Sequence, residues 1–185
     1  MRQQRRAGVT VLEQFEDQPE VAAALNQTLA DIYHDIGLYE QAHELQESAL
    51  ALRVETLGEN HPRTLESRRQ TGALLMDMGR YGDSETHFRQ VLNRRRAAAP
   101  GNQDPALYAS LRDLGAVLRW QAKYDQAEPI LIESLEGLTR LEGDDSIETA
   151  ATRINLGWLM NDTSRFTEAE PVLKAAAEGF AKAEG

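Results

Sequence analysis

Four short stretches decide the fold of this chain: Gly37-Leu38-Tyr39, Gly79-Arg80-Tyr81, Ala122-Lys123-Tyr124 and Ser164-Arg165-Phe166. Each ends in an aromatic residue, and the aromatic residues recur at intervals of 42, 43 and 42 residues. Two further columns keep the same spacing. A very small residue stands seven places before each stretch (Ala30, Gly72, Gly115, Gly157), and another stands three places after each aromatic (Ala42, Ser84, Ala127, Ala169). Columns that coincide at one period indicate a repeat of about 42 residues.

Each repeat reads as two helices joined at one of these stretches. Pro19, Pro62 and Pro105 mark the start of the first helix in three repeats, since proline is tolerated in the first helical turn. Asp104 is the expected N-cap of the third, and a capping box formed by Asp145 and Glu148 is expected to begin the fourth.

Proline also bears on the second helices. Pro129 and Pro171 are tolerable only near a helix start, so these helices are expected to begin at about Gln126 and Glu168.

The spacing of apolar residues predicts which side chains form the core. The first helices place them at i, i+4 and i+7, as in Leu25, Leu29 and Ile32, or Leu107, Leu111, Leu114 and Leu118. The small residues are expected to let the two helices of a repeat approach closely. The aromatic after each turn is expected to fill the gap between neighbouring repeats. One helix pair cannot bury its apolar face alone, so stacking of repeats supplies the core.

Composition excludes several classes of function. Of the 185 residues, 41% are hydrophobic. The chain has no cysteine, which removes disulfides, thiolate metal sites and cysteine nucleophiles. A net charge of −10 disfavours nucleic acid as a partner, because phosphate binding depends on basic charge. No apolar run is long enough to cross a membrane. The apolar stretch after the amino-terminal arginines is too short for a signal peptide, so the chain is expected to be cytoplasmic.

No signature of catalysis or of cofactor binding is present. The sequence contains no phosphate-binding loop, no dinucleotide-binding glycine motif and no nucleophile-elbow serine motif. The four histidines lack the spacing of a zinc site. The chain is therefore expected not to be an enzyme, with no catalytic residue, cofactor or metal.

The repeat resembles the tetratricopeptide repeat, in its long 42-residue form similar to that of kinesin light chains. The segment 57–64, Leu-Gly-Glu-Asn-His-Pro-Arg-Thr, matches the loop that ends that long repeat, and Leu114-Gly115 and Leu156-Gly157 match the columns of its first helix. The resemblance covers residues 19–185. It implies an all-α, right-handed α-solenoid of four repeats, at about 18–58, 61–101, 104–143 and 146–185. Residues 1–17 would be a partial leading helix, the second helix of a truncated repeat.

The same resemblance implies a function in protein–protein interaction. Such solenoids bind a peptide or helix of a partner in the concave groove that the first helices line. Carried across position by position, the candidate groove residues are Gln27, Asp31, Arg69, Asp77, Arg112, Arg119, Trp120, Ile154, Trp158 and Asn161. Where kinesin-light-chain-type repeats usually hold asparagine, this chain has Gln27, Arg69, Arg112 and Ile154.

Arginine and tryptophan are frequent at binding hot spots, so the partner is expected to be a protein or peptide with acidic and apolar side chains. The competing interpretation is that Arg69 and Arg112 pair with nearby carboxylates and that the tryptophans pack between repeats.

Two other functions remain open from the sequence. The chain could be the sensor or oligomerisation module of a larger bacterial signalling or regulatory protein. It could also associate with itself through its terminal helices, where Phe180 is the apolar residue that stands out. Residues 1–16 could fill the groove.

Overall fold

The computed structural model describes residues 15, 17–98, 101 and 103–184. The leading helix predicted for residues 1–17 falls almost wholly outside these residues. The chain divides into two compact units, residues 1–87 (unit 1) and 88–185 (unit 2), and each is described by itself. The predicted repeat boundaries stay a prediction, and the helices below are those that the structure contains.

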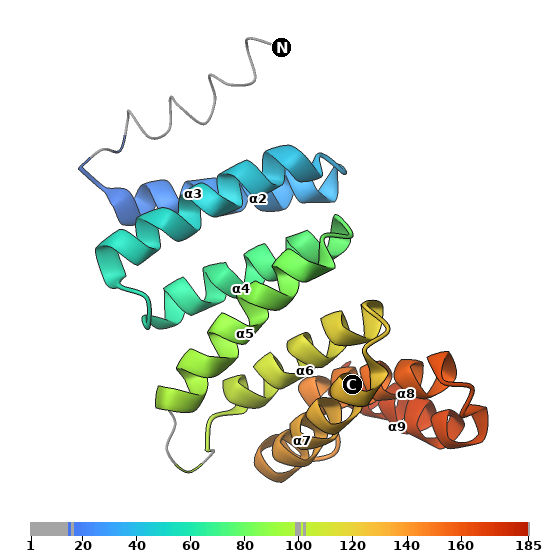
Figure 1. The fold of residues 1–185 in the computed structure, drawn as a ribbon. Helices are drawn as coiled ribbons and strands as arrows, with labels where there is room; N and C mark the ends of the chain where they lie inside the picture. Colours follow the sequence, from blue (N-terminus) through green and yellow to red (C-terminus); the bar gives the residue numbers. More distant parts are fainter. Residues whose placement is uncertain (1–14, 16, 99–100, 102, 185) are drawn as a thin grey trace. The chain divides into compact units, whose positions relative to one another are not determined.

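The described residues form helices and no strand (Figure 1). Unit 1 holds α2 (Pro19–Asp35), α3 (Tyr39–Leu57), α4 (Pro62–Asp77) and the start of α5 (Tyr81–Ala98). Unit 2 holds the rest of α5 with α6 (Pro105–Trp120), α7 (Tyr124–Glu142), α8 (Ile147–Asp162) and α9 (Phe166–Glu184). Helix α3 packs against α2 and α4; α7 packs against α6 and α8; α8 also packs against α9. The predicted all-α fold of stacked helix pairs is confirmed.

One turn geometry joins the two helices of every pair. Gly37, Gly79, Ala122 and Ser164 occupy the same place in it, each at a positive φ between 56° and 78°. In the first turn Gly37 N donates to His34 O at 2.9 Å, and Leu38 N donates to Tyr33 O at 2.8 Å. The other three turns repeat this hydrogen-bond pair. It is the Schellman arrangement, which satisfies the last carbonyl groups of a helix.

Side chains cap the first helices where the sequence provides them. His61 accepts a hydrogen bond from Arg63 N at 3.2 Å, and Asp104 accepts one from Ala106 N at 3.0 Å. The predicted cap of α8 is wrong: Ser146, not Asp145, is the N-cap, and its hydroxyl accepts from Thr149 N at 3.1 Å. Asp145 instead accepts from Lys182 Nζ at 3.0 Å.

The predicted starts of α7 and α9 are also wrong. These helices begin at Tyr124 and Phe166, so Pro129 and Pro171 lie inside them. The turn fixes the start, because its hydrogen bonds lead directly into the next helix and outweigh the backbone hydrogen bond that each proline removes.

The core of unit 2 follows the predicted apolar stripe. Leu107, Leu111, Leu114 and Leu118 are each 2% exposed or less. The stripe predicted for α2 is wrong, because Leu25 is 36% exposed and Ile32 is 49% exposed. The buried residues of α2 are the small ones and one amide: Ala22, Ala23, Asn26 and Ala30. Asn26 on this face donates to Ser48 Oγ of α3 at 3.1 Å, so α3 packs on the small-residue face of α2.

The aromatic residues after the turns do not all fill gaps as predicted. Tyr39 is 39% exposed and Phe166 is 63% exposed, whereas Tyr81 and Tyr124, which also begin their helices, are half-buried. The small-residue column does behave as predicted in unit 2. A Cβ on Gly115 would lie 2.6 Å from Leu131 Cγ, and one on Gly157 would lie 2.6 Å from Leu173 Cγ.

Candidate functional site

The first helices of unit 1 carry Gln27 and Asp31 on α2 and Arg69 and Asp77 on α4. Gln27 lies in a chain of amide hydrogen bonds that ends on α4. Its Nε2 donates to Asp31 Oδ1 at 3.0 Å and to Gln46 Oε1 at 2.7 Å, and Gln46 Nε2 donates to Ser67 O at 3.1 Å. These bonds fix the amide of Gln27 and tie α2, α3 and α4 together.

Asp77 forms a second link between α2 and α4. Its Oδ2 lies 2.8 Å from His34 Nε2, and Asp35 Oδ1 lies 3.5 Å from the other ring nitrogen. The hydrogen bond to Asp77 outweighs partial burial and raises the pKa of His34 above its ordinary value of 6.5. The repeat register places His34 on the first-helix surface but does not predict that it pairs across helices.

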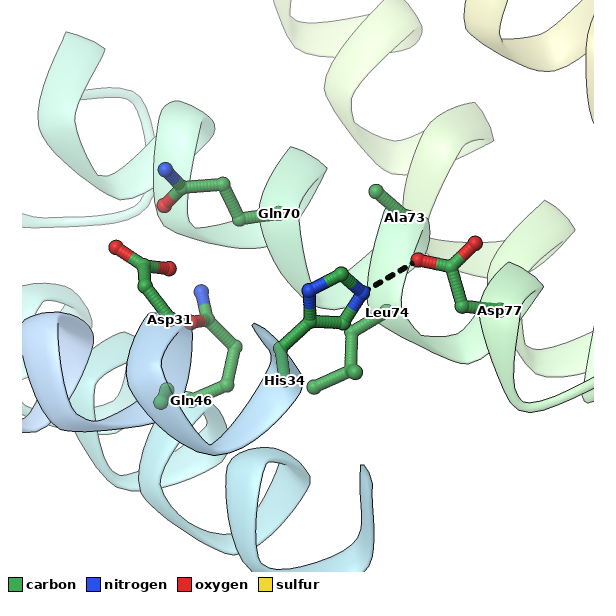
Figure 2. A pocket seen from close by; sticks show the side chains of 8 residues that line it. Asp31, His34, Gln46, Gln70, Ala73, Leu74 and Asp77 are labelled. Atoms are coloured by element: carbon green, nitrogen blue, oxygen red, sulfur yellow. Dashed lines mark hydrogen bonds and ion pairs between the residues drawn. The ribbon is translucent and has the colours of Figure 1, made fainter. Parts of the chain in front are cut away.

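His34 and Asp77 line a small pocket of about 150 Å³ in unit 1 (Figure 2). Asp31 and Gln70 extend into it from the two first helices, α2 and α4. Its wall is completed by Ala30, Gln46, Ala73 and Leu74. We call it the acidic pocket.

Arg69 does not reach this pocket. Its guanidinium makes a two-pronged contact with Glu66 one helical turn away, with the shortest N–O distance at 2.7 Å. The competing interpretation of the sequence, that Arg69 pairs with a nearby carboxylate, is therefore confirmed.

Arg112 is likewise engaged in unit 2. It pairs with Asp113 at 3.1 Å on its own helix and with Glu148 on α8. Burial opposes the charge of Arg112, but the two carboxylates outweigh it and raise the pKa of the guanidinium. The side chain of Arg112 is only 15% exposed, and its ion pair with Glu148 links α6 to α8.

Arg119, the third candidate arginine, lies over the ring of Trp120. Arg119 Nη1 lies 2.6 Å from Asp162 Oδ2, and its guanidinium carbon lies 4.9 Å from the ring centre of Trp120. Only 12% of the Arg119 side chain is exposed. A cation held over the face of an indole stabilises the orientation of the ring.

The two tryptophans are the exposed part of this site. Trp120 is 53% exposed and Trp158 is 50% exposed, which contradicts the interpretation that both pack between repeats. They line an open recess of about 540 Å³ together with Arg119, Ala122, Tyr124 and Asp162. We call it the tryptophan recess. Ile154 and Asn161 are half-buried on α8 and do not line it.

Sequence reasoning missed two features of these sites. His34–Asp77 and Arg119–Asp162 are equivalent pairs: in each, the partners are 43 residues apart and join successive first helices. Both pairs could have been found by comparing successive repeats. In each pair a basic residue of one first helix is followed, one repeat and one position later, by an aspartate of the next first helix. Ala122 and Tyr124 of the recess come from the turn, for which the sequence predicted a structural role alone.

Within the described residues, no group of three or more histidines or acidic residues is placed to hold a metal ion. None of the helices described here is both long and apolar enough to cross a membrane.

The repeated helix pair is shared with a known protein family. The profile of the tetratricopeptide repeat family matches residues 20–97 and 106–182. No curated protein matches this chain.

Several solved structures share the fold. BtubC (BKLC) from P. vanneervenii superposes with a TM-score of 0.76 at 20% identity, covering 98% of this chain and 75% of that one. A kinesin-light-chain-like protein of Podosopora anserina with nearly identical TPR-like repeats gives 0.70 at 19%, covering 98% and 89%. YrrB, described as a TPR protein with an unusual peptide-binding site, gives 0.55 at 16%, covering 95% and 75%. The family profile spans most of the chain and its helix pairs repeat in register, so this chain belongs to the tetratricopeptide repeat family.

Proposed function

We propose that this chain is a protein-interaction scaffold that binds a peptide or helix of a partner protein on its first-helix surface. The observation that supports this most is the tryptophan recess. Two half-exposed indoles line an open recess of about 540 Å³. They leave a large apolar area for a partner to cover.

The apolar side chain of the partner is the main determinant in this proposal. Arg69 and Arg112 already pair with carboxylates, so neither is offered to an acidic ligand. An acidic side chain of the partner would compete with Asp162 for Arg119 at the edge of the recess. We therefore propose an apolar or aromatic anchor in the recess, with an acidic neighbour as a secondary contact.

Intrinsic fluorescence gives a direct test, because Trp120 and Trp158 are the only two tryptophans of the chain. Peptides would be selected on the immobilised chain from a random library, and their binding followed by tryptophan emission. We expect Trp120→Ala and Trp158→Ala each to weaken the selected peptides by about tenfold or more, as at other hot spots.

Ile132→Ala is the matched control. Ile132 is 40% exposed on α7, a second helix of the same unit, and its removal should leave the affinity unchanged. Circular dichroism would verify that each variant stays folded. Selected peptides that bind both tryptophan variants at full affinity, with no change in emission, would place the binding surface elsewhere. Self-association through the terminal helices stays a prediction; Phe180 is half-buried in α9.

A further inference from the structure

The acidic pocket of unit 1 presents mainly hydrogen-bond acceptors. Asp31 is exposed, and its Oδ1 accepts from Gln27. Gln70 Oε1 is buried and has no hydrogen-bond partner among the residues that the structure describes. Gln46 is 2% exposed, and its amide hydrogen-bonds to Gln27 and to the Ser67 carbonyl, so it holds its neighbours in place.

The charge of this pocket is negative. Asp31 and Asp77 line it, and His34 is the one basic side chain among the residues that line it. Asp35 stands beside His34 on the same helix, at 3.5 Å from the ring. When His34 is neutral, the carboxylates have no compensating cation among the lining residues. A ligand that brings positive charge and N–H donors would satisfy both the carboxylates and the buried amide oxygen.

The size and wall of the pocket limit the ligand. Its volume is about 150 Å³. At about 30 Å³ for each water molecule, the pocket has room for the head of one long side chain. Ala30 and Ala73 leave this space open, and Leu74 supplies apolar surface against which methylene groups can pack. Lysine and arginine combine such a stem with a cationic head.

We propose that the acidic pocket binds the cationic head of a lysine or arginine side chain of a partner peptide, through Asp31, Asp77 and the amide oxygen of Gln70. This inference deepens the proposed function and rests on it for the source of the side chain. It adds a polar subsite in unit 1 that is separate from the apolar recess of unit 2.

Protonation of His34 should regulate this subsite. The titratable groups that face His34 are Asp31 and Asp35 from α2, Tyr39 from α3 at a ring distance of 5.5 Å, and Asp77 from α4. A protonated His34 competes with the ligand for Asp77, whereas the lysine head keeps its charge up to about pH 10. Binding should therefore weaken as the pH falls from about 8 to about 5.5.

Nuclear magnetic resonance on the full chain tests the proposal with single capped amino acids as probes. Nα-acetyl-lysine N-methylamide and its arginine counterpart would be titrated against the ¹⁵N-labelled protein, with the norleucine counterpart as the neutral control. We expect both cationic probes to shift the amide signals of residues 30–35 and 70–77, with the tighter of the two identifying the preferred head. Norleucine should leave these signals in place.

Two variants separate charge from hydrogen bonding. Asp31→Asn should weaken the cationic probes about threefold to fivefold, the range that an exposed ion pair provides. Gln70→Leu should weaken them by a similar factor, about threefold to fivefold, because it removes one hydrogen bond to the cationic head. Asp83→Asn removes the same charge from unit 1 at an exposed carboxylate that pairs with Arg80, and should have no effect. The pH dependence should disappear in His34→Gln.

Three results would overturn the inference: no shift with either cationic probe, an equal shift with norleucine, or equal weakening by Asp83→Asn. None of these depends on the tryptophan recess, because the probes report on residues of unit 1 alone. Loss of peptide binding in the tryptophan variants and loss of probe binding here are thus separate failures.

Discussion

At the scale of single residues, the backbone conformation of the turns is kept even where the residue is unsuited to it. Gly37 and Gly79 have positive φ values of 78° and 72°, which glycine adopts freely. Ala122 and Ser164 hold the same place at 56° and 62°. This left-handed region costs an L-residue about 1–2 kcal/mol. The two Schellman hydrogen bonds and the packing of the joined helices outweigh this strain.

Substitutions at these four turn positions should change stability in opposite directions, depending on whether glycine is introduced or removed. Ala122→Gly and Ser164→Gly relieve the strain and should raise the free energy of unfolding by about 0.5–1 kcal/mol. Gly37→Ala and Gly79→Ala should lower it by about 1 kcal/mol. The reason is the backbone alone, since a Cβ at either glycine would meet no atom of the described residues within 4 Å. Urea unfolding of the four variants measures this. Equal effects of all four would show that the turn is not strained.

The pKa values of His34 and His87 are shifted in opposite directions from the ordinary value of histidine. The hydrogen bond to Asp77 raises the pKa of His34 above 6.5, whereas burial, aided by Arg68 and His43, lowers the pKa of His87 below it. The contribution of His34 to stability is therefore fully present below pH 6.5 and is lost as the pH rises through its folded pKa. The contribution of His87 has the other sign: stability falls as the pH drops below 6.5.

Histidine ring signals followed by nuclear magnetic resonance over a pH series give both values in one experiment. In Asp77→Asn the His34 signal should move toward the ordinary midpoint of 6.5, while the His87 signal stays where it was. An unchanged His34 midpoint in this variant would rule out the pair with Asp77 in solution.

At the scale of helices, the small-residue column sets how closely two helices of a pair pack. A side chain at Gly115 would press on Leu131, which is fully buried. A side chain at Gly157 would press on Leu173, which is half-buried and can shift toward solvent. Equivalent positions in the repeat therefore differ in how much they tolerate.

Alanine substitutions should rank these positions. Gly115→Ala should lower the free energy of unfolding by about 1–2 kcal/mol, because overpacking exceeds the gain in helix propensity. Gly157→Ala should change it by less than about 1 kcal/mol. Gly82 is the control position, because a Cβ at this glycine would have no neighbour within 4 Å in the part of the chain that the structure describes. Gly82→Ala should raise stability by up to about 1 kcal/mol. Thermal unfolding measures the order, and a Gly157→Ala variant less stable than Gly115→Ala would contradict it.

At the scale of the whole molecule, the core differs in kind along the chain. The buried residues of α2 are three alanines and Asn26, whereas α6 buries four leucines, a valine and Tyr108 among others. Apolar burial contributes roughly 25 cal/mol per Å², so the leucine-rich helices contribute more to stability than α2 does. In repeat proteins local stability follows such differences, because each repeat is held by its neighbours alone.

Hydrogen–deuterium exchange followed by mass spectrometry should show this gradient. Amides of α6 and α7 should exchange slowest among the described helices, and those of α2 fastest, because local opening is easiest where little apolar surface is buried. Equal protection of α2 and α6 would mean that the chain opens only as one cooperative body.

Much of the fold could be predicted because repetition makes local signals reinforce one another. The turn stretches, the proline at three helix starts and the small-residue columns placed every helix pair, and Asp104 was identified as a cap. The starts of α7 and α9 differ from the prediction, because the turn geometry outweighs the local effect of Pro129 and Pro171 on the helix. The leucines of α2 were missed because periodicity identifies an apolar face without saying which neighbour packs there.

The repeat, the helix pairs and the register that puts Trp120, Arg119 and Asp77 on first helices follow from the sequence, because a period of 42–43 residues fixes which positions are equivalent. Which of these side chains are available to a partner depends on how the helices pack in three dimensions. Arg69 and Arg112 are held by carboxylates, Trp120 and Trp158 stand half-exposed, and His34 meets Asp77 across helices. Pairing and exposure depend on distances between side chains from different helices, and no spacing along the chain records them.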